Sequence, residues 1–362
     1  MNGVLLALAL AVQPGPQGQP VETAMSLPPS PEQVMAIPDE LRAAFHRDVV
    51  DATSFPEARL QRLVSFVYAD SGLGVEYKAD ATHTVAESFA SRQVNCLSST
   101  LMIVALAREA GLDADGQQVE RILTWGASGA TVIQSKHVNA VVKVADKRDF
   151  VVDIDGEDLV IRDAPDPMSD SHLLALFYGN RAMELLLEDR LDEADAWLAA
   201  AFRQKSDDAG LLNNAGVLSL RRGDTKTAER YFLQAVEQND VELSALSNLV
   251  ALYRRLGNGG READWRGRAD EILRQDPYYQ FTLGRQHERA GDYDAAAKQY
   301  RRAIRLNRNE PRFRYGMARV HFLEGKYQKA DRELMAAVKL AGGQLRGRYQ
   351  DKLAALRRLD DR

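Results

Sequence analysis

The sequence predicts two folded regions, a mixed α+β domain in the first half and an all-α solenoid in the second. Two observations lead to this prediction. Between residues 96 and 156, a long apolar helix is followed by valine-rich runs with strand character. From about residue 170, small and large apolar residues recur every 34 positions. With 362 residues, 45% of them hydrophobic, the chain can bury two cores.

The first 37 residues are expected to precede the folded part. Residues 4–12 form an apolar run that is too short to cross a bilayer and has the length of a signal-peptide core. Residues 1–13 are therefore predicted to be a signal peptide, which makes the protein periplasmic or secreted. It is cytoplasmic if the run is not a signal. Seven of the twelve prolines lie from Pro14 to Pro38, and this predicts an extended linker over residues 14–37.

The α+β domain is assigned to residues 38–168. Two helices are expected to begin it, one at Pro38 and one at Pro56, because proline is favoured in the first turn of a helix. A third helix is predicted to start at Cys96, with Asn95 as its N-cap.

Strands are expected beyond this third helix. Residues 118–123, 137–144 and 150–156 have strand character, and a short charged loop joins the last two runs. These two runs are therefore predicted to form a β-hairpin.

Cys96 is the only cysteine of the chain, and its place at a helix start suggests a chemical role. The partial positive charge of a first helical turn favours the thiolate form of a cysteine. A thiolate nucleophile needs a base, and a histidine base needs an acceptor that orients it. His137 begins the predicted hairpin, and Asp153 and Asp155 share one face of the returning strand, so either can face the imidazole. The alternative is a cysteine that packs as a small hydrophobic residue.

Residues 75–156 resemble the transglutaminase-like (papain-like) superfamily, and more closely its bacterial branch fused to tetratricopeptide repeats. The residues that carry the resemblance are Tyr77, 84–89, 92–98, 105–112, His137 and 150–153. The resemblance implies that Cys96 is the nucleophile, His137 the base, and Asp153 rather than Asp155 the orienting carboxylate. The few histidines, the single cysteine and the absence of clustered ligand spacing predict no metal site. No glycine loop of the phosphate-binding kind occurs in the sequence, so no cofactor is expected.

For the oxyanion of an acyl-transfer reaction, the candidates are the backbone N–H of Cys96 and the side chain of Gln93. Val94 stands where the superfamily usually has glycine, and Asn139 stands where many members have the tryptophan of a His-Ala-Trp motif. These two departures favour the alternative of a catalytically inactive domain.

Residues 170–343 repeat with a period of 34 residues. Small residues recur in one register, large residues in a second, and alanine throughout in a third. The first register is Ala182, Gly216, Val250, Gly284 and Ala318. The second is Leu198, Phe232, Arg266, Tyr300 and Leu334, and the third is Ala201, Ala235, Ala269, Ala303 and Ala337. Small residues let two helices approach, and the large side chains fill the space between them. The pattern resembles about five tetratricopeptide repeats (TPRs), each a helix-turn-helix.

Glycine is predicted to make the turn inside a repeat, at Gly223, Gly291 and Gly325. The third repeat is expected to be a distorted helix pair, because Glu262 and Arg266 break the pattern there. Residues 344–362 are predicted to form a capping helix that closes the solenoid.

The predicted partner is a protein or peptide that lies along the groove of the repeats. Asn180, Asn214 and Asn248 recur at a position that contacts ligand backbone in peptide-binding members of the family; the alternative is that asparagine simply recurs with the repeat. Positive residues recur on the first helix of each later repeat, where they suit an acidic segment or serve solubility. They are Arg254, Arg255, Arg285, Arg289 and Arg319. The net charge of −5 gives no large positive field for nucleic acid, and no membrane-spanning segment is expected.

The leading hypothesis is thiol-dependent acyl transfer or hydrolysis on carboxamide or peptide substrates through a Cys96 thioester, with the repeats recruiting a protein or peptide. The alternative is a catalytically inactive transglutaminase-like fold in which the repeats are the functional part. A redox sensor is disfavoured, because the chain has no second cysteine to resolve an oxidised thiol.

Overall fold

The computed structural model describes residues 27–119, 126–128, 131–133, 137–144, 148–154, 166–239 and 242–360. The described chain divides into two compact units, one up to Glu262 and one from Ala263 onward. The predicted signal peptide at residues 1–13 and most of the predicted linker lie outside the described residues. No helix of the described chain is long and apolar enough to cross a membrane.

The first unit begins with short helices around one helix, α5, whose central part is buried. Their bounds are α1 Pro31–Val34, α2 Asp39–Phe45, the π-helical turn η1 His46–Val50, α3 Pro56–Tyr68, α4 Val85–Ser91 and α5 Cys96–Glu109. Helix α4 starts in a capping box, in which Thr84 and Glu87 each bond the backbone of the other. Helix α5 is buried from Leu97 to Ala107, because its sequence is apolar on every side.

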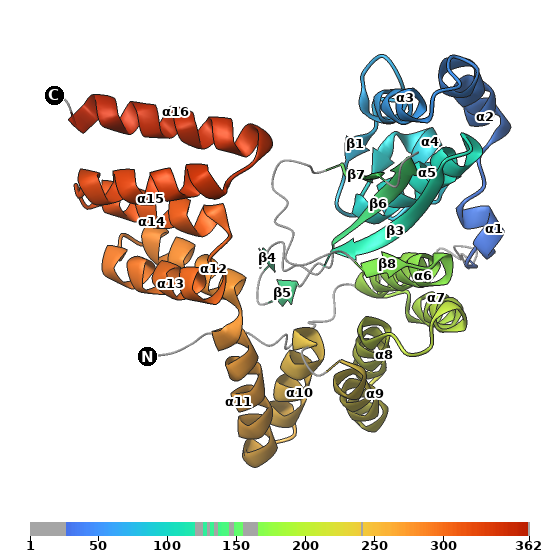
Figure 1. The fold of residues 1–362 in the computed structure, drawn as a ribbon. Coiled ribbons are helices and arrows are strands. Elements are labelled where there is room, and N and C mark those ends of the chain that lie inside the picture. Colours follow the sequence, from blue (N-terminus) through green and yellow to red (C-terminus); the bar gives the residue numbers. More distant parts are fainter. Residues whose placement is uncertain are drawn as a thin grey trace, which may run out of the picture. The chain divides into compact units, whose positions relative to one another are not determined.

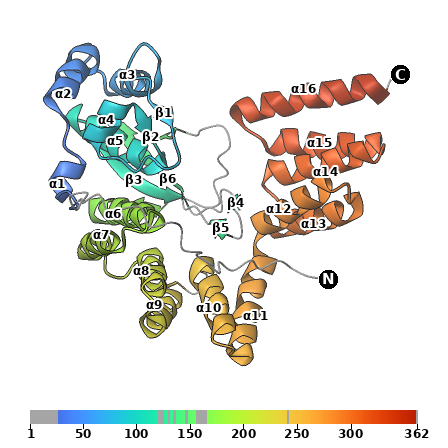
Figure 2. The same ribbon diagram turned by 180° about the vertical axis from the view of Figure 1, so that it is seen from behind.

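A four-stranded antiparallel sheet packs against α5 (Figures 1 and 2). Its strands are β3 Asp113–Val119, β6 His137–Val144, β7 Arg148–Val152 and β8 Asp166–Met168, in the order β7-β6-β3-β8. Strands β6 and β7 form the predicted hairpin, with Ala140 opposite Val152. Strand β3 includes residues 118 and 119 of the run predicted over 118–123 but begins five residues earlier, at Asp113, so the predicted start was wrong. Residues 120–123 of that run lie outside the described residues. Its central residues are Gly116, Gln117 and Gln118, one glycine and two polar residues, which hid the strand pattern.

Two further strand pairs are short. The pairs are β1 Glu76–Tyr77 with β2 Gln93–Val94, which are parallel, and β4 Gly126–Ser128 with β5 Thr131–Ile133, which are antiparallel. Val94 is fully buried in β2 and lies opposite Tyr77. Val94 therefore contributes to the core.

From Asp170 onward the chain is helical. The helices are α6 Asp170–Leu187, α7 Leu191–Gln204, α8 Ala209–Arg221, α9 Thr225–Gln238, α10 Leu243–Arg255, α11 Gly259–Gln275, α12 Pro277–Arg289, α13 Tyr293–Leu306, α14 Pro311–Leu323, α15 Tyr327–Leu340 and α16 Gly343–Asp360. Helices α6 and α7, α8 and α9, α12 and α13, and α14 and α15 pack as pairs. Helix α16 lies on α15 and buries Tyr349 and Leu356.

The predicted close approach of paired helices is present in both units. A Cβ atom placed on Gly216 would lie 2.5 Å from the ring of Phe232, and one on Gly284 would lie 2.5 Å from the ring of Tyr300. Both rings are fully buried. Glycine at this repeat position therefore makes room for the large residue of the second helix.

Turn glycines adopt the left-handed conformation, as predicted. Gly223, Gly291 and Gly325 have φ of 82°, 77° and 72°, a region where glycine has no steric penalty. The first repeat has Asp189 at the equivalent position, with φ of 63°.

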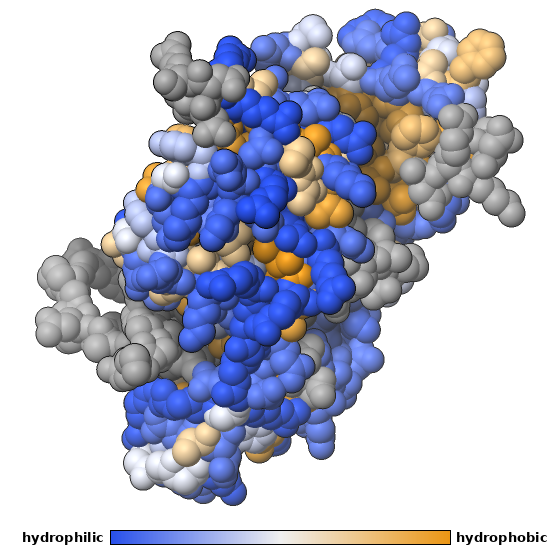
Figure 3. Space-filling model, turned by 60° about the vertical axis from the view of Figure 1, so that its left-hand side comes forward, coloured by the Kyte–Doolittle hydropathy of each residue, from blue (hydrophilic) through white to orange (hydrophobic). Residues whose placement is uncertain are grey.

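One hydrophobic core runs through the first unit without a break between the sheet and the first repeats. It joins residues from Val34 on α1 to Leu218 on α8. Leu173 of α6 lies over β3, since a Cβ atom on Gly116 would be 3.3 Å from its side chain. The division into two units falls inside α11, the second helix of the irregular third repeat. The protein surface seen in Figure 3 is mostly hydrophilic, with hydrophobic side chains gathered in a few patches.

Candidate functional site

Cys96 is the first residue of α5 and is partly exposed. Asn95 caps the helix as predicted, and its side chain accepts a hydrogen bond from the N–H of Ser98 at 2.9 Å. The amide of Asn95 also donates to the hydroxyl of Thr82 at 2.9 Å. The cap residue is 5% exposed, so the start of the helix is held rigidly beside the thiol.

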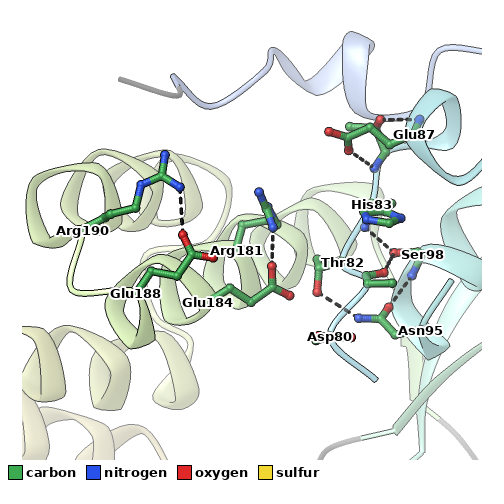
Figure 4. Close-up of polar contacts among 12 residues, drawn as sticks. Asp80, Thr82, His83, Glu87, Asn95, Ser98, Arg181, Glu184, Glu188 and Arg190 are labelled. Carbon is green, nitrogen blue, oxygen red and sulfur yellow. Dashed lines mark hydrogen bonds and ion pairs between the residues drawn. The ribbon is translucent and has the colours of Figure 1, made fainter. Parts of the chain in front are cut away.

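A second set of hydrogen bonds fastens the segment before α4 to the same helical turn (Figure 4). The hydroxyl of Ser98 donates to the carbonyl of Ala81 at 2.8 Å and accepts from the N–H of His83 at 2.6 Å. Ring nitrogen Nδ1 of His83 lies 3.1 Å from the carbonyl of Gln93. Gln93 is half-buried two residues before the cap.

Tyr68 connects this helical turn to Asp153. Its hydroxyl lies 2.6 Å from that of Ser99, one turn along α5 from Cys96. Burial raises the pKa of Tyr68 to about 12, the bond to Ser99 opposes this, and the negative charge of Asp153 raises the pKa further. The carboxylate of Asp153 therefore acts electrostatically on a side chain bonded to the first turns of α5.

Asp153 is also attached to the strand that carries His137. The amide of Asn139 donates to Oδ2 of Asp153 at 3.2 Å, and Asn139 is only 2% exposed. Its carbonyl oxygen Oδ1 is buried and has no hydrogen-bond partner among the described residues. His137 begins β6 two residues earlier, with its backbone opposite Val119. The side chain of His137 and all of Asp155 lie outside the described part of the chain.

The sequence prediction missed the residues that support this region. Tyr68, Thr82, Ser98 and Ser99 join α5 to the elements around it. The run of three hydroxyl residues from Ser98 to Thr100, inside an otherwise apolar helix, is the signal that marks them, because buried hydroxyl groups require partners. No cluster of three or more potential metal ligands occurs within the described ranges.

The three repeat asparagines lie on first helices of the first unit. Asn180 is exposed on α6 and Asn214 is half-buried on α8. The amide of Asn248 on α10 donates to the carbonyl oxygen of Asn213 at 2.8 Å. This bond links two neighbouring first helices, so Asn248 has a structural contact at the position predicted for ligand binding.

Comparison with known proteins identifies the repeats. Residues 284–325 match a family model for the TPR repeat. No curated protein sequence matches the chain. The chain therefore contains tetratricopeptide repeats, a module that mediates protein–protein interaction.

Several solved structures resemble part of the chain at low identity. One is PilF of Pseudomonas aeruginosa, at 16% identity over 52% of this chain and 90% of that one, with a TM-score of 0.28. Another is YrrB, described as a TPR protein with an unusual peptide-binding site, at 20% identity over 49% and 92% with a TM-score of 0.26. A third is MamA of Desulfovibrio magneticus RS-1, at 16% identity over 48% and 96% with a TM-score of 0.27.

Proposed function

We propose that this chain recruits a protein or peptide through its repeats and acts on it by thiol-dependent acyl transfer or hydrolysis at Cys96. The observation that carries the proposal is the position of Asp153. Its carboxylate is bonded to Asn139, on the strand that His137 begins, and it acts on Tyr68, which is bonded to α5 one turn from Cys96. Helix α5 packs on β6, which His137 begins, and β6 pairs with β7, which Asp153 directly follows; this arrangement supports the proposal.

The proposed chemistry follows from these three residues. The thiolate of Cys96 attacks the carbonyl carbon of a carboxamide or peptide bond, and the imidazolium of His137 gives its proton to the nitrogen that leaves. The C–N bond breaks and a thioester forms on the sulfur. A water molecule or an amine then attacks the thioester and gives a proton to His137, and the C–S bond breaks to release the thiolate of Cys96 beside the imidazolium. Asp153 orients the imidazole throughout.

The first turn of α5 supplies the part of the site that would bind the oxyanion. Backbone N–H groups in the first turn have no partner within the helix, and that of Cys96 is available to a developing oxyanion. The hydrogen bonds of Asn95 and Ser98 hold this turn in place. Such fixed donors stabilise charge without having to reorganise during the reaction.

The test is the rate of Cys96 alkylation by iodoacetamide at pH 7 in the full chain. In His137→Ala and in Asp153→Asn, we expect the rate to fall about tenfold or more, because the thiol of Cys96 loses its base or the carboxylate that orients the base, and less of it is ionised. His172→Ala, on α6, is the matched control and leaves the rate unchanged. Incorporation of a fluorescent primary amine into a glutamine peptide, and cleavage of the same peptide, then separate transfer from hydrolysis. Equal alkylation rates in all four proteins overturn the proposal.

The second candidate is a catalytically inactive module whose function lies in the repeats. It is favoured by Asn139, which occupies the position of the usual tryptophan and is held by Asp153. It is also favoured by the family match, which covers repeat residues alone. If this candidate is correct, Cys96→Ala binds the partner as tightly as the wild type, and neither protein incorporates the amine or cleaves the peptide.

A further inference from the structure

The overall charge of −5 hides a strong asymmetry between the two units. Residues up to Glu262 contain 24 Lys and Arg against 38 Asp and Glu, a net charge of −14. Residues from Ala263 onward contain 23 against 14, a net charge of +9. A positive field of this size raises the local concentration of negatively charged partners. The second unit is therefore the part of the chain suited to an acidic ligand.

A pocket of about 470 Å³ lies within this second unit, between α13, α14 and α15. On α13 it is lined by Lys298, Arg301 and Arg305, whose spacing of three and four residues places them on one face of the helix. All three are exposed. Neither Lys298 nor Arg305 forms an ion pair with any carboxylate of the described chain, and Nε of Arg301 donates only to the carbonyl of Ala297 in its own helix.

The far wall of the pocket adds a fourth cation and the single carboxylate of the lining. Nη1 of Arg314 on α14 lies 2.9 Å from the carboxylate of Glu333 on α15. Nε of Arg314 is buried and has no hydrogen-bond partner among the described residues. One carboxylate thus faces four positive side chains, and the pocket has an excess of three positive charges.

The remaining lining residues are aliphatic or thioether side chains. Ile304 is half-buried and Met317 is 3% exposed. No aromatic ring lines the pocket, whereas proteins that bind single-stranded nucleic acid stack the bases on aromatic side chains. The volume is in the range that holds a few side chains or a small ligand. A peptide with an aliphatic side chain between carboxylates fits the charge, the apolar lining and the volume of this pocket better than a nucleic acid does.

We propose that this pocket binds an acidic peptide segment of a partner protein, in which an aliphatic side chain lies between Asp or Glu residues. The aliphatic group contacts Ile304 and Met317, and the flanking carboxylates pair with Lys298, Arg301 and Arg305. The site is formed by α13, α14 and α15, and none of its lining residues is at the repeat position of Asn180, Asn214 and Asn248. The inference rests on the recruiting part of the proposed function and not on the chemistry of Cys96.

The test is fluorescence anisotropy with the full chain and a labelled ten-residue peptide that has one central leucine between Asp and Glu residues. Lys298→Glu with Arg305→Glu is expected to weaken binding at least about tenfold, because two attractive charges become repulsive. Lys329→Glu with Arg332→Glu on α15 is the matched control. It has the same net charge and exposed positions, and it is expected to change the affinity less than about twofold. Circular dichroism of both variants verifies that the helices remain folded.

Two further measurements define the ligand. Replacing every Asp and Glu of the peptide by Asn and Gln is expected to abolish binding, and replacing its leucine by serine to weaken it several-fold. Equal losses in the pocket and control variants overturn the proposal, because they show a diffuse charge effect. Absence of binding, or displacement of the peptide by a single-stranded oligonucleotide at lower concentration, overturns it as well. Alkylation of Cys96 is measured on the same variants, so that failure of this site and failure of the thiol chemistry are told apart.

Discussion

The two units of the chain are built from similar helices but are stabilised in different ways. In the first unit, α6 to α8 share one continuous core with α5 and the sheet. In the second unit, the repeats bury smaller separate clusters, one around Tyr300 and Met317 and one around Leu334 and Tyr349. A solenoid repeat normally depends on its neighbours alone. The comparison shows that the first repeats share their core with a globular domain, so we expect their stability to be tied to it.

Leu173→Ala gives the largest effect and tests this dependence. Leu173 is fully buried and lies over Gly116 of β3. Its truncation is expected to destabilise the first unit by about 3 kcal/mol, through lost burial and the cavity that remains. Hydrogen exchange should then show reduced protection in α5 as well as in α6, while α14 and α15 keep theirs. Leu334→Ala on α15 is the control. It should reduce protection in α14 and α15 and leave that of α5 and α6 unchanged. Unchanged protection in α5 would show that the sheet and the repeats fold separately.

A change of pH tests the first unit at Tyr68, next to the candidate site. Folding raises the pKa of this phenol from its ordinary value of 10.0 to about 12. The unfolded chain therefore releases the proton first. The stabilising contribution is complete below pH 10 and is lost as the pH rises from 10 to 12, by about 1.4 kcal/mol for each pH unit.

The measurement is urea unfolding at pH 9 and pH 11 of the wild type and of Tyr68→Phe. The wild type is expected to lose about 1–2 kcal/mol more stability than the variant over this interval. Equal losses would mean that folding does not raise the pKa of Tyr68.

The close contact between the two helices of a repeat can be tested at the same repeat position in both units, with Gly284→Ala and Gly216→Ala. Each new methyl group meets a buried ring at 2.5 Å. The hydroxyl of Tyr300 donates to Glu288 at 2.7 Å, so this ring cannot move without breaking a buried hydrogen bond, whereas Phe232 has no such bond. We expect a loss of about 2 kcal/mol at Gly284 and about 1 kcal/mol at Gly216.

Gly267→Ala is the control for these two variants. Gly267 lies in α11 with open space around its Cα, and alanine there should stabilise the helix by about 0.5–1 kcal/mol. Thermal unfolding followed by circular dichroism measures all three variants. Equal losses at Gly284 and Gly216 would show that the bond from Tyr300 to Glu288 does not hold the ring.

Most of the repeat region could be predicted from the sequence, because a repeat places the same contact at a fixed spacing. The small residues at Gly216 and Gly284 and the turn glycines at Gly223, Gly291 and Gly325 required only a period of 34. Gly257 has the same left-handed conformation and also follows this period. The basic pocket could not be found in this way, since its residues come from three helices and depend on how neighbouring repeats pack.

The candidate site at Cys96 was predictable only in part. The helix start, its cap and the hairpin each have a local pattern, and all three were found. The contact of Asn139 with Asp153 and the bond of Tyr68 to Ser99 join residues 14 and 31 positions apart. Such contacts follow from the packing of α3 on α5 and the pairing of β7 with β6, and not from any sequence period. Val94 and Asn139 appeared as departures from a motif, and in the structure both are buried residues of the core region.

The smallest expected effect concerns Asp189, where the first repeat departs from the others. Asp189 adopts the left-handed conformation that glycine adopts at Gly223, Gly291 and Gly325, which is strained for a residue with a Cβ atom. Its carboxylate is largely exposed and lies 3.1 Å from Arg221, an ion pair that contributes little in water. Asp189→Gly is therefore expected to stabilise the first unit by about 0.5 kcal/mol, because relief of backbone strain exceeds the lost ion pair.

Gly223→Ala is the reverse change in the next repeat, and it is expected to destabilise by about 1 kcal/mol. Urea unfolding of the two variants gives both values in one experiment. If Asp189→Gly is instead destabilising, the ion pair with Arg221 outweighs the strain. The first repeat would then hold its turn through a side-chain contact, where the later repeats hold it through backbone conformation alone.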